Sequence, residues 1–387
     1  MKLFGRLKRW AVLGGLVLAT SAHAQKEQWL EYHTTSEGRG YRYLDLTTNP
    51  PANVALPGKL NARPYFARWN SPLDGKDGSR WICFDRTRKS GPYDLVYFDS
   101  TGNGRLDDKA LVKATRVEEY YSYFGPLKVV FKGEDGPIAY HLLFQFMKFE
   151  SDDTRLLIRS AGYYGGTIEV AGKKRHLELI DRNVNGAFND GASDSVEGDS
   201  VKVEGDKNGE HLLGKLLEVD NQFFRIEAAR DGAFVKIQPA DDVVLGKVRV
   251  PESISEFVAY GENGEFTRHP VKGELTLPAG SYRLMRWAIE RKDAKGASWR
   301  LTAYGSDDSG KFKVGEAQPC ALQVGEPIQM ELKATELTNQ VAFNLGFQAH
   351  YKEDIQFTKG EDRPPGPKMV LASLDGAYRS TNSFEFG

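Results

Sequence analysis

The stretch LKVVF, residues Leu127–Phe131, sets a lysine among β-branched and aromatic residues, a composition typical of a β-strand. Segments of the same kind recur at Gly166–Val170, Phe223–Glu227, Ala233–Ile237 and Ile328–Leu332. Glycine-rich stretches such as EDGP at 134–137 and GDKNG at 205–209 lie between them and favour hairpin turns. We therefore predict an all-β chain built of sandwich or barrel modules. Only Lys109–Tyr121 has helical character.

The chain divides into three expected structural regions. Residues 25–245 form a β-rich domain with charged turns, residues 246–318 a small β-sandwich module, and residues 319–387 a C-terminal β-sandwich module. The string GELTLPAGSYRL at 273–284 resembles the strand, tight turn and strand of transthyretin-like or immunoglobulin-like modules in exported bacterial proteins.

Residues 1–24 have the three parts of a cleavable signal peptide. A basic start precedes an apolar run at Trp10–Thr20, and small residues at Ala22 and Ala24 suit cleavage before Gln25. The apolar run is shorter than the roughly 20 residues that span a bilayer. We expect a periplasmic or secreted protein with no membrane anchor after cleavage.

The charge of the chain is nearly balanced, with 52 basic and 53 acidic residues. Removal of the basic signal peptide leaves a mildly acidic chain without a basic stripe, which argues against nucleic acid and anionic membranes as partners. Cys83 and Cys320 are the two cysteines, and their spacing leaves open one long-range disulfide or two thiols.

The most informative feature is an internal repeat of an apolar run followed by a polar loop. LVYF at 95–98 precedes DSTGNGRLDD at 99–108, and LELI at 177–180 precedes DRNVNGAFND at 181–190. We call the two polar stretches loop 1 and loop 2. Calcium takes six to eight oxygen ligands, and alternate side chains on a tightly turning backbone can supply them.

Each loop offers oxygens at positions 1, 3, 5, 7, 9 and 10, with a glycine at position 6 for the turn. The residue at position 7 would contribute its carbonyl oxygen. The candidate ligands are Asp99, Thr101, Asn103, Arg105, Asp107 and Asp108 in loop 1, and Asp181, Asn183, Asn185, Ala187, Asn189 and Asp190 in loop 2.

These loops resemble the calcium loops of EF-hands, dockerins and integrin-type propellers. They depart from EF-hands at position 12, where Ala110 and Ala192 replace the bidentate glutamate, and both follow strand-like runs. The likeness is therefore closer to a short loop between strands, with Asp190 or Asp194 available to complete the second site. So few carboxylates imply weak sites, in the extracellular range of about 0.1–1 mM.

An ordinary turn is the alternative, because Asn-Gly favours a two-residue hairpin and Asp or Asn can bond its own backbone. The two loops align without gaps and share more polar positions than an ordinary turn requires, which favours a metal site.

The sequence shows no catalytic signature such as Gly-x-Ser-x-Gly or His-Glu-x-x-His. The layout resembles exported bacterial proteins that combine calcium-like loops with β modules. We expect a calcium-binding structural or binding module with a protein or glycan partner. The alternative is a polysaccharide-active enzyme or glycan binder, with tyrosines such as Tyr120 and Tyr121 on its binding face. A cleft with two carboxylates roughly 5 to 10 Å apart would favour the enzyme.

Overall fold

The computed structural model describes residues 26–61, 63–75, 78–133, 136–150, 153–192, 197–306, 310–338 and 340–384. The predicted signal peptide and Asp194 lie outside these ranges, as does the side chain of Asp108. Within them the regular structure is β-strand with two short 3-10 turns, which confirms the all-β prediction. None of the described residues form a helix that could cross a membrane.

The first part of the chain forms a sandwich of two five-stranded sheets. One sheet has the order β4 (Leu46–Thr47), β5 (Tyr65–Asn70), β6 (Ser79–Asp85), β7 (Leu95–Phe98) and β8 (Leu111–Lys113). The other has the order β3 (Tyr41–Leu44), β12 (Thr154–Ser160), β11 (Gly136–Lys148), β10 (Tyr121–Gly133) and β9 (Arg116–Val117). Alternate apolar residues face inward, so that the ring of Phe84 in β6 contacts those of Phe124 and Phe146 in the other sheet.

The prediction of a helix near Lys109–Tyr121 is wrong. The 3-10 turn η2 (Asp108–Ala110) is followed by the short strands β8 and β9. Val112 pairs with Val96 across the β7–β8 ladder, so that tertiary pairing overrides the weak helical tendency of the segment.

A second pair of sheets follows the first sandwich. Its five-stranded sheet has the order β16 (Glu210–Leu212), β15 (Ser200–Val203), β14 (Lys173–Ile180), β13 (Gly162–Val170) and β2 (Glu31–Thr34). Its four-stranded sheet has the order β1 (Glu27–Trp29), β19 (Phe234–Pro239), β18 (Gln222–Ala228) and β17 (Leu216–Val219). One continuous apolar core runs through this sandwich and the first.

The remaining strands form a third body around a separate core. A small sheet holds β23 (Glu274–Pro278), β20 (Leu245–Arg249) and β27 (Cys320–Ala321). A larger sheet has the order β22 (Gly264–Arg268), β21 (Ile254–Gly261), β24 (Gly280–Lys292), β25 (Ser298–Tyr304), β30 (Asp354–Lys359), β29 (Gln340–Gln348) and β28 (Gln329–Leu337), with β26 (Lys311–Val314) on β24. Strands from both sides of the expected boundary at residue 318 therefore share this body.

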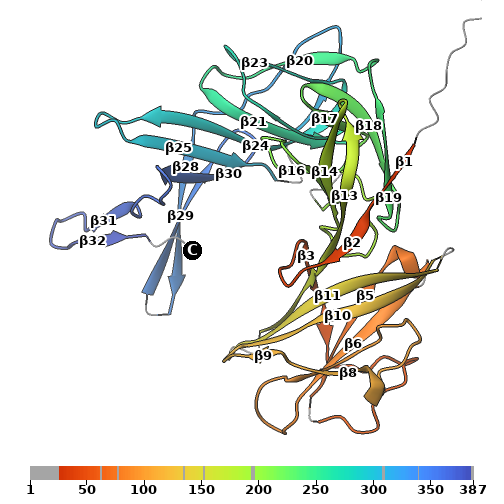
Figure 1. Ribbon diagram of the computed structural model, residues 1–387. Helices are drawn as coiled ribbons and strands as arrows, with labels where there is room; N and C mark the ends of the chain where they lie inside the picture. Colours follow the sequence, from red (N-terminus) through yellow and green to blue (C-terminus); the bar gives the residue numbers. More distant parts are fainter. Residues whose placement is uncertain are drawn as a thin grey trace, which may run out of the picture.

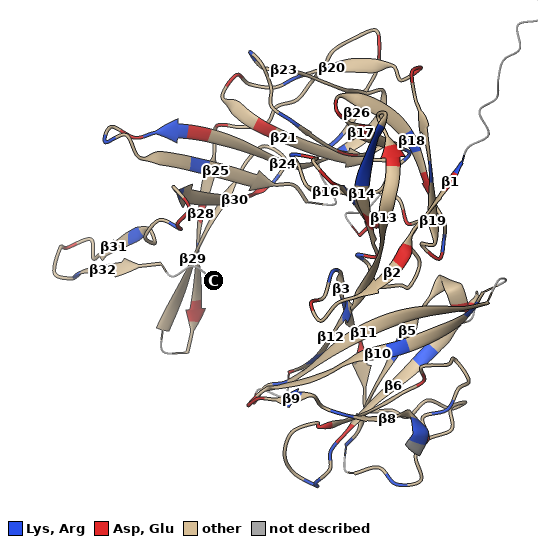
Figure 2. Ribbon diagram, in the orientation of Figure 1, with Lys and Arg blue, Asp and Glu red and all other residues tan. Residues whose placement is uncertain are grey.

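The chain as a whole bends into an arch (Figure 1). The first sandwich lies at one end, and the hairpins β28–β29 and β31 (Lys368–Ala372) with β32 (Arg379–Ser383) lie at the other. Acidic and basic residues are interspersed along the strands (Figure 2). Cys83 is buried and Cys320 half-buried, and both are free thiols.

Candidate functional site

Loop 1 begins where β7 ends, and the buried carboxylate of Asp99 organises it. Asp99 Oδ1 accepts the backbone N–H of Asn103 at 3.0 Å, and Oδ2 accepts that of Gly104 at 2.8 Å. The Asn103 side chain in turn accepts the N–H of Arg105 at 3.0 Å. Gly104 has a φ of +71°, a left-handed conformation that glycine adopts without strain. The residues at positions 1, 5 and 6 of loop 1 therefore stabilise a tight polar turn, the first two by hydrogen bonds and the glycine by its left-handed conformation.

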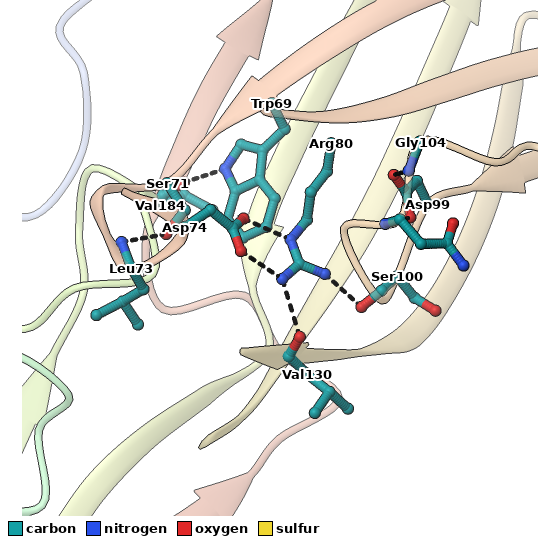
Figure 3. Close-up of polar contacts among 11 residues, drawn as sticks. Trp69, Ser71, Leu73, Asp74, Arg80, Asp99, Ser100, Gly104, Val130 and Val184 are labelled. Carbon is teal, nitrogen blue, oxygen red and sulfur yellow. Dashed lines mark hydrogen bonds and ion pairs between the residues drawn. The ribbon is translucent and has the colours of Figure 1, made fainter. Parts of the chain in front are cut away.

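The buried guanidinium of Arg80 contacts the start of loop 1 and links it to neighbouring segments (Figure 3). Its Nε and Nη2 donate to the two carboxylate oxygens of Asp74 at 2.7 and 2.8 Å. Nη2 also donates to the Val130 carbonyl at 2.9 Å, and Nη1 donates to the carbonyl of Ser100. A permanent cation of the protein thus fixes this loop against β10.

Loop 2 begins where β14 ends and repeats the turn of loop 1. Asp181 is fully buried, and its carboxylate accepts the backbone N–H groups of Asn185 at 3.3 Å and Gly186 at 2.7 Å. Asn185 Oδ1 accepts the N–H of Ala187 at 2.8 Å, just as Asn103 does for Arg105. The two loops therefore share hydrogen bonds as well as sequence.

Loop 2 differs from loop 1 in gathering three carboxylates. The side-chain amides of Asn183 and Asn185 both donate to Asp190 Oδ2, at 3.1 and 2.6 Å. The backbone N–H of Asp190 donates to Asp199 Oδ2 at 2.8 Å. Among the described residues, Asp199 Oδ1 is buried and has no hydrogen-bond partner. Asp199 itself is fully buried.

The pairing of β14 with β15 explains why Asp199 reaches this loop. Ile180 pairs with Ser200 at the end of this ladder, so Asp181, which follows β14, and Asp199, which precedes β15, both lie directly beyond the last pair. Burial raises the pKa of Asp181 to about 7, against opposing contributions from the Tyr140 hydroxyl and backbone N–H groups. Burial, and then the charge of Asp181, raise the pKa of Asp199 well above its ordinary value. Both shifts express the cost of placing two negative charges in a dry interior.

Loop 2 also lies at the junction of the first two sandwiches. Trp69 of β5 donates its indole N–H to the Val184 carbonyl at 2.7 Å, a contact shown in Figure 3. The Ser160 hydroxyl at the end of β12 donates to the Asp181 carbonyl at 3.0 Å. The ring of Phe188 contacts Tyr140 of the first sandwich and Tyr164 of the second. Any ligand of loop 2 would therefore act on this junction.

The predicted ligands are only partly brought together. In loop 1, Thr101 and Asn103 are exposed, and Arg105 pairs with Asp107 at 3.0 Å through exposed atoms. In loop 2, Asn189 is exposed, whereas Asp181, Asn183, Asn185 and Asp190 are linked by hydrogen bonds. Across the described residues, no three His, Cys, Asp or Glu side chains are arranged to hold a metal ion. The carboxylates of loop 2 instead face N–H donors.

Asp199 is the residue that reading the sequence for loop motifs missed. It lies outside the repeat, and the signal that could have found it is the strand-like pattern of SVKV at 200–203, which can pair with LELI at 177–180. Comparison with protein-family models, curated proteins and solved structures finds no match for this chain.

Proposed function

We propose that this chain is an exported calcium-binding β protein, in which loop 2 binds Ca²⁺ as a structural ion at the junction of the first two sandwiches. The observation that carries the proposal is the buried Oδ1 of Asp199, which has no hydrogen-bond partner in the part of the chain that the structure describes and lies near the buried carboxylate of Asp181. An unsatisfied buried carboxylate oxygen costs free energy, and a second buried charge beside it adds to that cost.

The oxygens around loop 2 suit a hard cation. Three carboxylates, of Asp181, Asp190 and Asp199, would provide charge, and Asn183 and Asn185 would provide amide oxygens, once these side chains turn from the N–H groups they now contact toward the ion. Calcium prefers such a set of carboxylate, amide and carbonyl oxygens. A bound ion would neutralise the negative charge of the carboxylates, which N–H donors stabilise only by hydrogen bonding. It would also favour the ionised form of all three acids.

A structural role follows from where loop 2 lies. Its backbone carbonyls accept hydrogen bonds from Trp69 and Ser160 of the first sandwich. Ordering of the loop by calcium would therefore also order the contact between the sandwiches. Loop 1 differs because Arg80 already provides a fixed cation at its start. Calcium concentrations outside the cytoplasm are high enough to occupy weak sites.

Thermal melting of the mature chain, from Gln25 onward, tests the proposal in calcium and in chelator. Calcium at about 100 times its dissociation constant should add roughly 2.7 kcal/mol to the free energy of unfolding, a shift of several degrees. Asp199→Asn should lose this shift. In chelator the same variant should melt no lower than the wild type, because burial already disfavours the ionised form of Asp199 and a neutral amide can replace the carboxyl group.

Asp107→Asn is the matched variant in loop 1, because Asp107 is partly exposed and already paired with Arg105. It should keep the calcium shift. The proposal fails if calcium leaves wild-type melting unchanged, or if Asp199→Asn and the wild type respond to calcium alike.

A second candidate function is glycan binding at a different place. A pocket of about 440 Å³ is lined by Tyr93, Tyr120 and Tyr121, together with Arg86 and the carboxylates of Glu118 and Glu119. Aromatic faces beside acidic and basic side chains suit sugar rings and their hydroxyls. The two carboxylates belong to adjacent residues, which supports a binding role more directly than an acid–base pair across a cleft.

Affinity electrophoresis in gels containing soluble starch, xylan or hydroxyethyl cellulose tests this second function. Retardation of the wild type that Tyr120→Ala abolishes would support it. Tyr43→Ala is the control, because Tyr43 is an exposed tyrosine that is not among the residues that line the pocket. Equal mobility with and without every polysaccharide would count against it.

A further inference from the structure

Strand β28 is the last strand of the large sheet of the third body. It pairs with β29 from Gln329↔Gln348 to Leu337↔Gln340 without a bulge, and every residue in it is exposed. Figure 1 shows this hairpin projecting at the end of the arch. A regular edge strand of this length offers a row of unpaired backbone N–H and C=O groups to another strand.

The hairpin is amphipathic, because side chains alternate between its two faces. On one face the cross-strand pairs are Met330↔Phe347, Leu332↔Leu345 and Ala334↔Phe343. Met330 is 68% exposed and Leu332 is 50% exposed. The opposite face of β28 carries Glu331 and Lys333, which are both exposed and form an ion pair with each other at 3.2 Å. An exposed apolar stripe beside an open edge is typical of an interaction surface.

Among antiparallel pairings of β28 with a second β28 that are centred on Glu331, Leu332 or Lys333, the charges favour the one centred on Leu332. In an antiparallel pair of two β28 strands centred on Leu332, Glu331 of each copy lies opposite Lys333 of the other, and Leu332 lies opposite Leu332. Apolar residues then share one face of the extended sheet. Shifting the centre to Glu331 places two glutamates opposite each other, and shifting it to Lys333 places two lysines opposite each other. Opposite charges at directly facing positions stabilise a sheet, and like charges destabilise it.

We propose that the protein forms a two-fold symmetric dimer in which β28 pairs antiparallel with β28 of a second copy, centred on Leu332. The large sheets of both copies then become one continuous sheet. Met330 of each copy lies across from Ala334 of the other, so the apolar stripe continues over the dimer. The interface is isologous, as in most homodimers, and it closes without leaving a free edge at β28. It is independent of the proposed calcium site.

Sedimentation velocity of the mature chain over micromolar concentrations tests the dimer. The wild type should sediment as a dimer. Glu331→Lys and Lys333→Glu should each weaken dimerisation by about tenfold or more, because two attractive pairs per dimer become two repulsive ones. The double variant Glu331→Lys with Lys333→Glu restores opposite charges at both pairs and should regain nearly wild-type affinity.

Glu336→Lys is the control, since it adds the same charge to β28 where the proposed register puts no charged residue opposite. It should change dimerisation much less than Glu331→Lys. Far-ultraviolet circular dichroism of each variant checks that the surface substitutions leave the fold intact. A monomeric wild type would overturn the proposal, and so would single variants that dimerise normally or a double variant that does not recover.

Discussion

The hydroxyl of Tyr140 donates a hydrogen bond to Oδ2 of Asp181 at 2.8 Å. Tyr140 belongs to β11 of the first sandwich, and Asp181 follows β14 of the second. Both side chains are almost completely buried. Burial and the neighbouring carboxylate raise the pKa of Tyr140 well above its ordinary value, so the hydroxyl stays a donor. One bond therefore links the two sandwiches to the acidic centre of loop 2.

Tyr140→Phe should lower the free energy of unfolding by about 1–3 kcal/mol, because it leaves a buried carboxylate oxygen with one donor fewer. Urea denaturation of the mature chain in chelator measures this change. Tyr43→Phe removes a hydroxyl from a residue that is 56% exposed, and it should alter stability by less than about 0.5 kcal/mol. Equal midpoints for the two variants would contradict the role given to Tyr140.

The contribution of Asp181 to stability without calcium should fall as pH rises from about 4 to about 7. The folded protein holds the Asp181 proton up to a pKa of about 7, whereas an unfolded aspartate releases it near the ordinary value of 3.8. The folded state therefore binds more protons in this window, and the free energy of unfolding declines until the folded pKa is passed. Asp199 adds a change of the same sign.

Calcium should reverse this pH trend, since it binds the ionised carboxylates. Melting temperatures measured from pH 4 to 8 in chelator and in calcium provide the comparison. Asp181→Asn removes the titrating group and should flatten the decline seen in chelator. A wild-type melting temperature that rises with pH in chelator would be the opposite of the expected result.

The fold was predictable because alternation along single strands carries the signal. In β10, Val129 and Phe131 are buried and Lys128 is exposed, as the LKVVF stretch indicates. The order of strands was not predictable, because pairing depends on long-range contacts. β25 and β30 are neighbours although the expected boundary at residue 318 falls between them.

Only the part of the candidate site that is formed by residues close together in the sequence was predictable. The repeat fixes the turn around Asp99 and Asp181, because each carboxylate bonds N–H groups four and five residues ahead. Asp199 is brought to loop 2 by the register of β14 with β15. Tyr140 reaches it because the first sandwich packs against the second. No spacing within loop 2 encodes either contact. The difference between Arg80 behind loop 1 and the carboxylates around loop 2 likewise lies outside the repeat.

Arg80→Met should destabilise the protein by about 3–5 kcal/mol, since it leaves Asp74 without its buried partner and removes one donor each from the carbonyls of Ser100 and Val130. Urea denaturation measures the loss. Arg105→Met is the matched control from loop 1, because the Arg105 side chain is 58% exposed in its ion pair with Asp107. The control should change stability by less than about 1 kcal/mol. Similar losses for both arginines would show that Arg80 does not anchor the loop.

The glycines at position 6 of the two loops should respond differently to alanine, although the repeat makes them equivalent. Both have positive φ, +71° at Gly104 and +89° at Gly186. A Cβ at Gly104 would meet only the Asn53 carbonyl at 3.9 Å, whereas one at Gly186 would lie 2.9 Å from Ser71 Oγ and 3.0 Å from the Phe131 ring.

Gly104→Ala should therefore cost only the left-handed backbone strain, about 1–2 kcal/mol. Gly186→Ala adds a steric clash with the first sandwich, and overpacking of this kind costs typically about 1–3 kcal/mol more. Thermal melting of the two variants in chelator compares them directly. Because Ser71 and Phe131 both belong to the first sandwich, the larger loss at Gly186 would measure how tightly loop 2 is packed into the junction. Equal losses would mean that the junction yields at loop 2, and a calcium ion bound there could then do little to hold the sandwiches together.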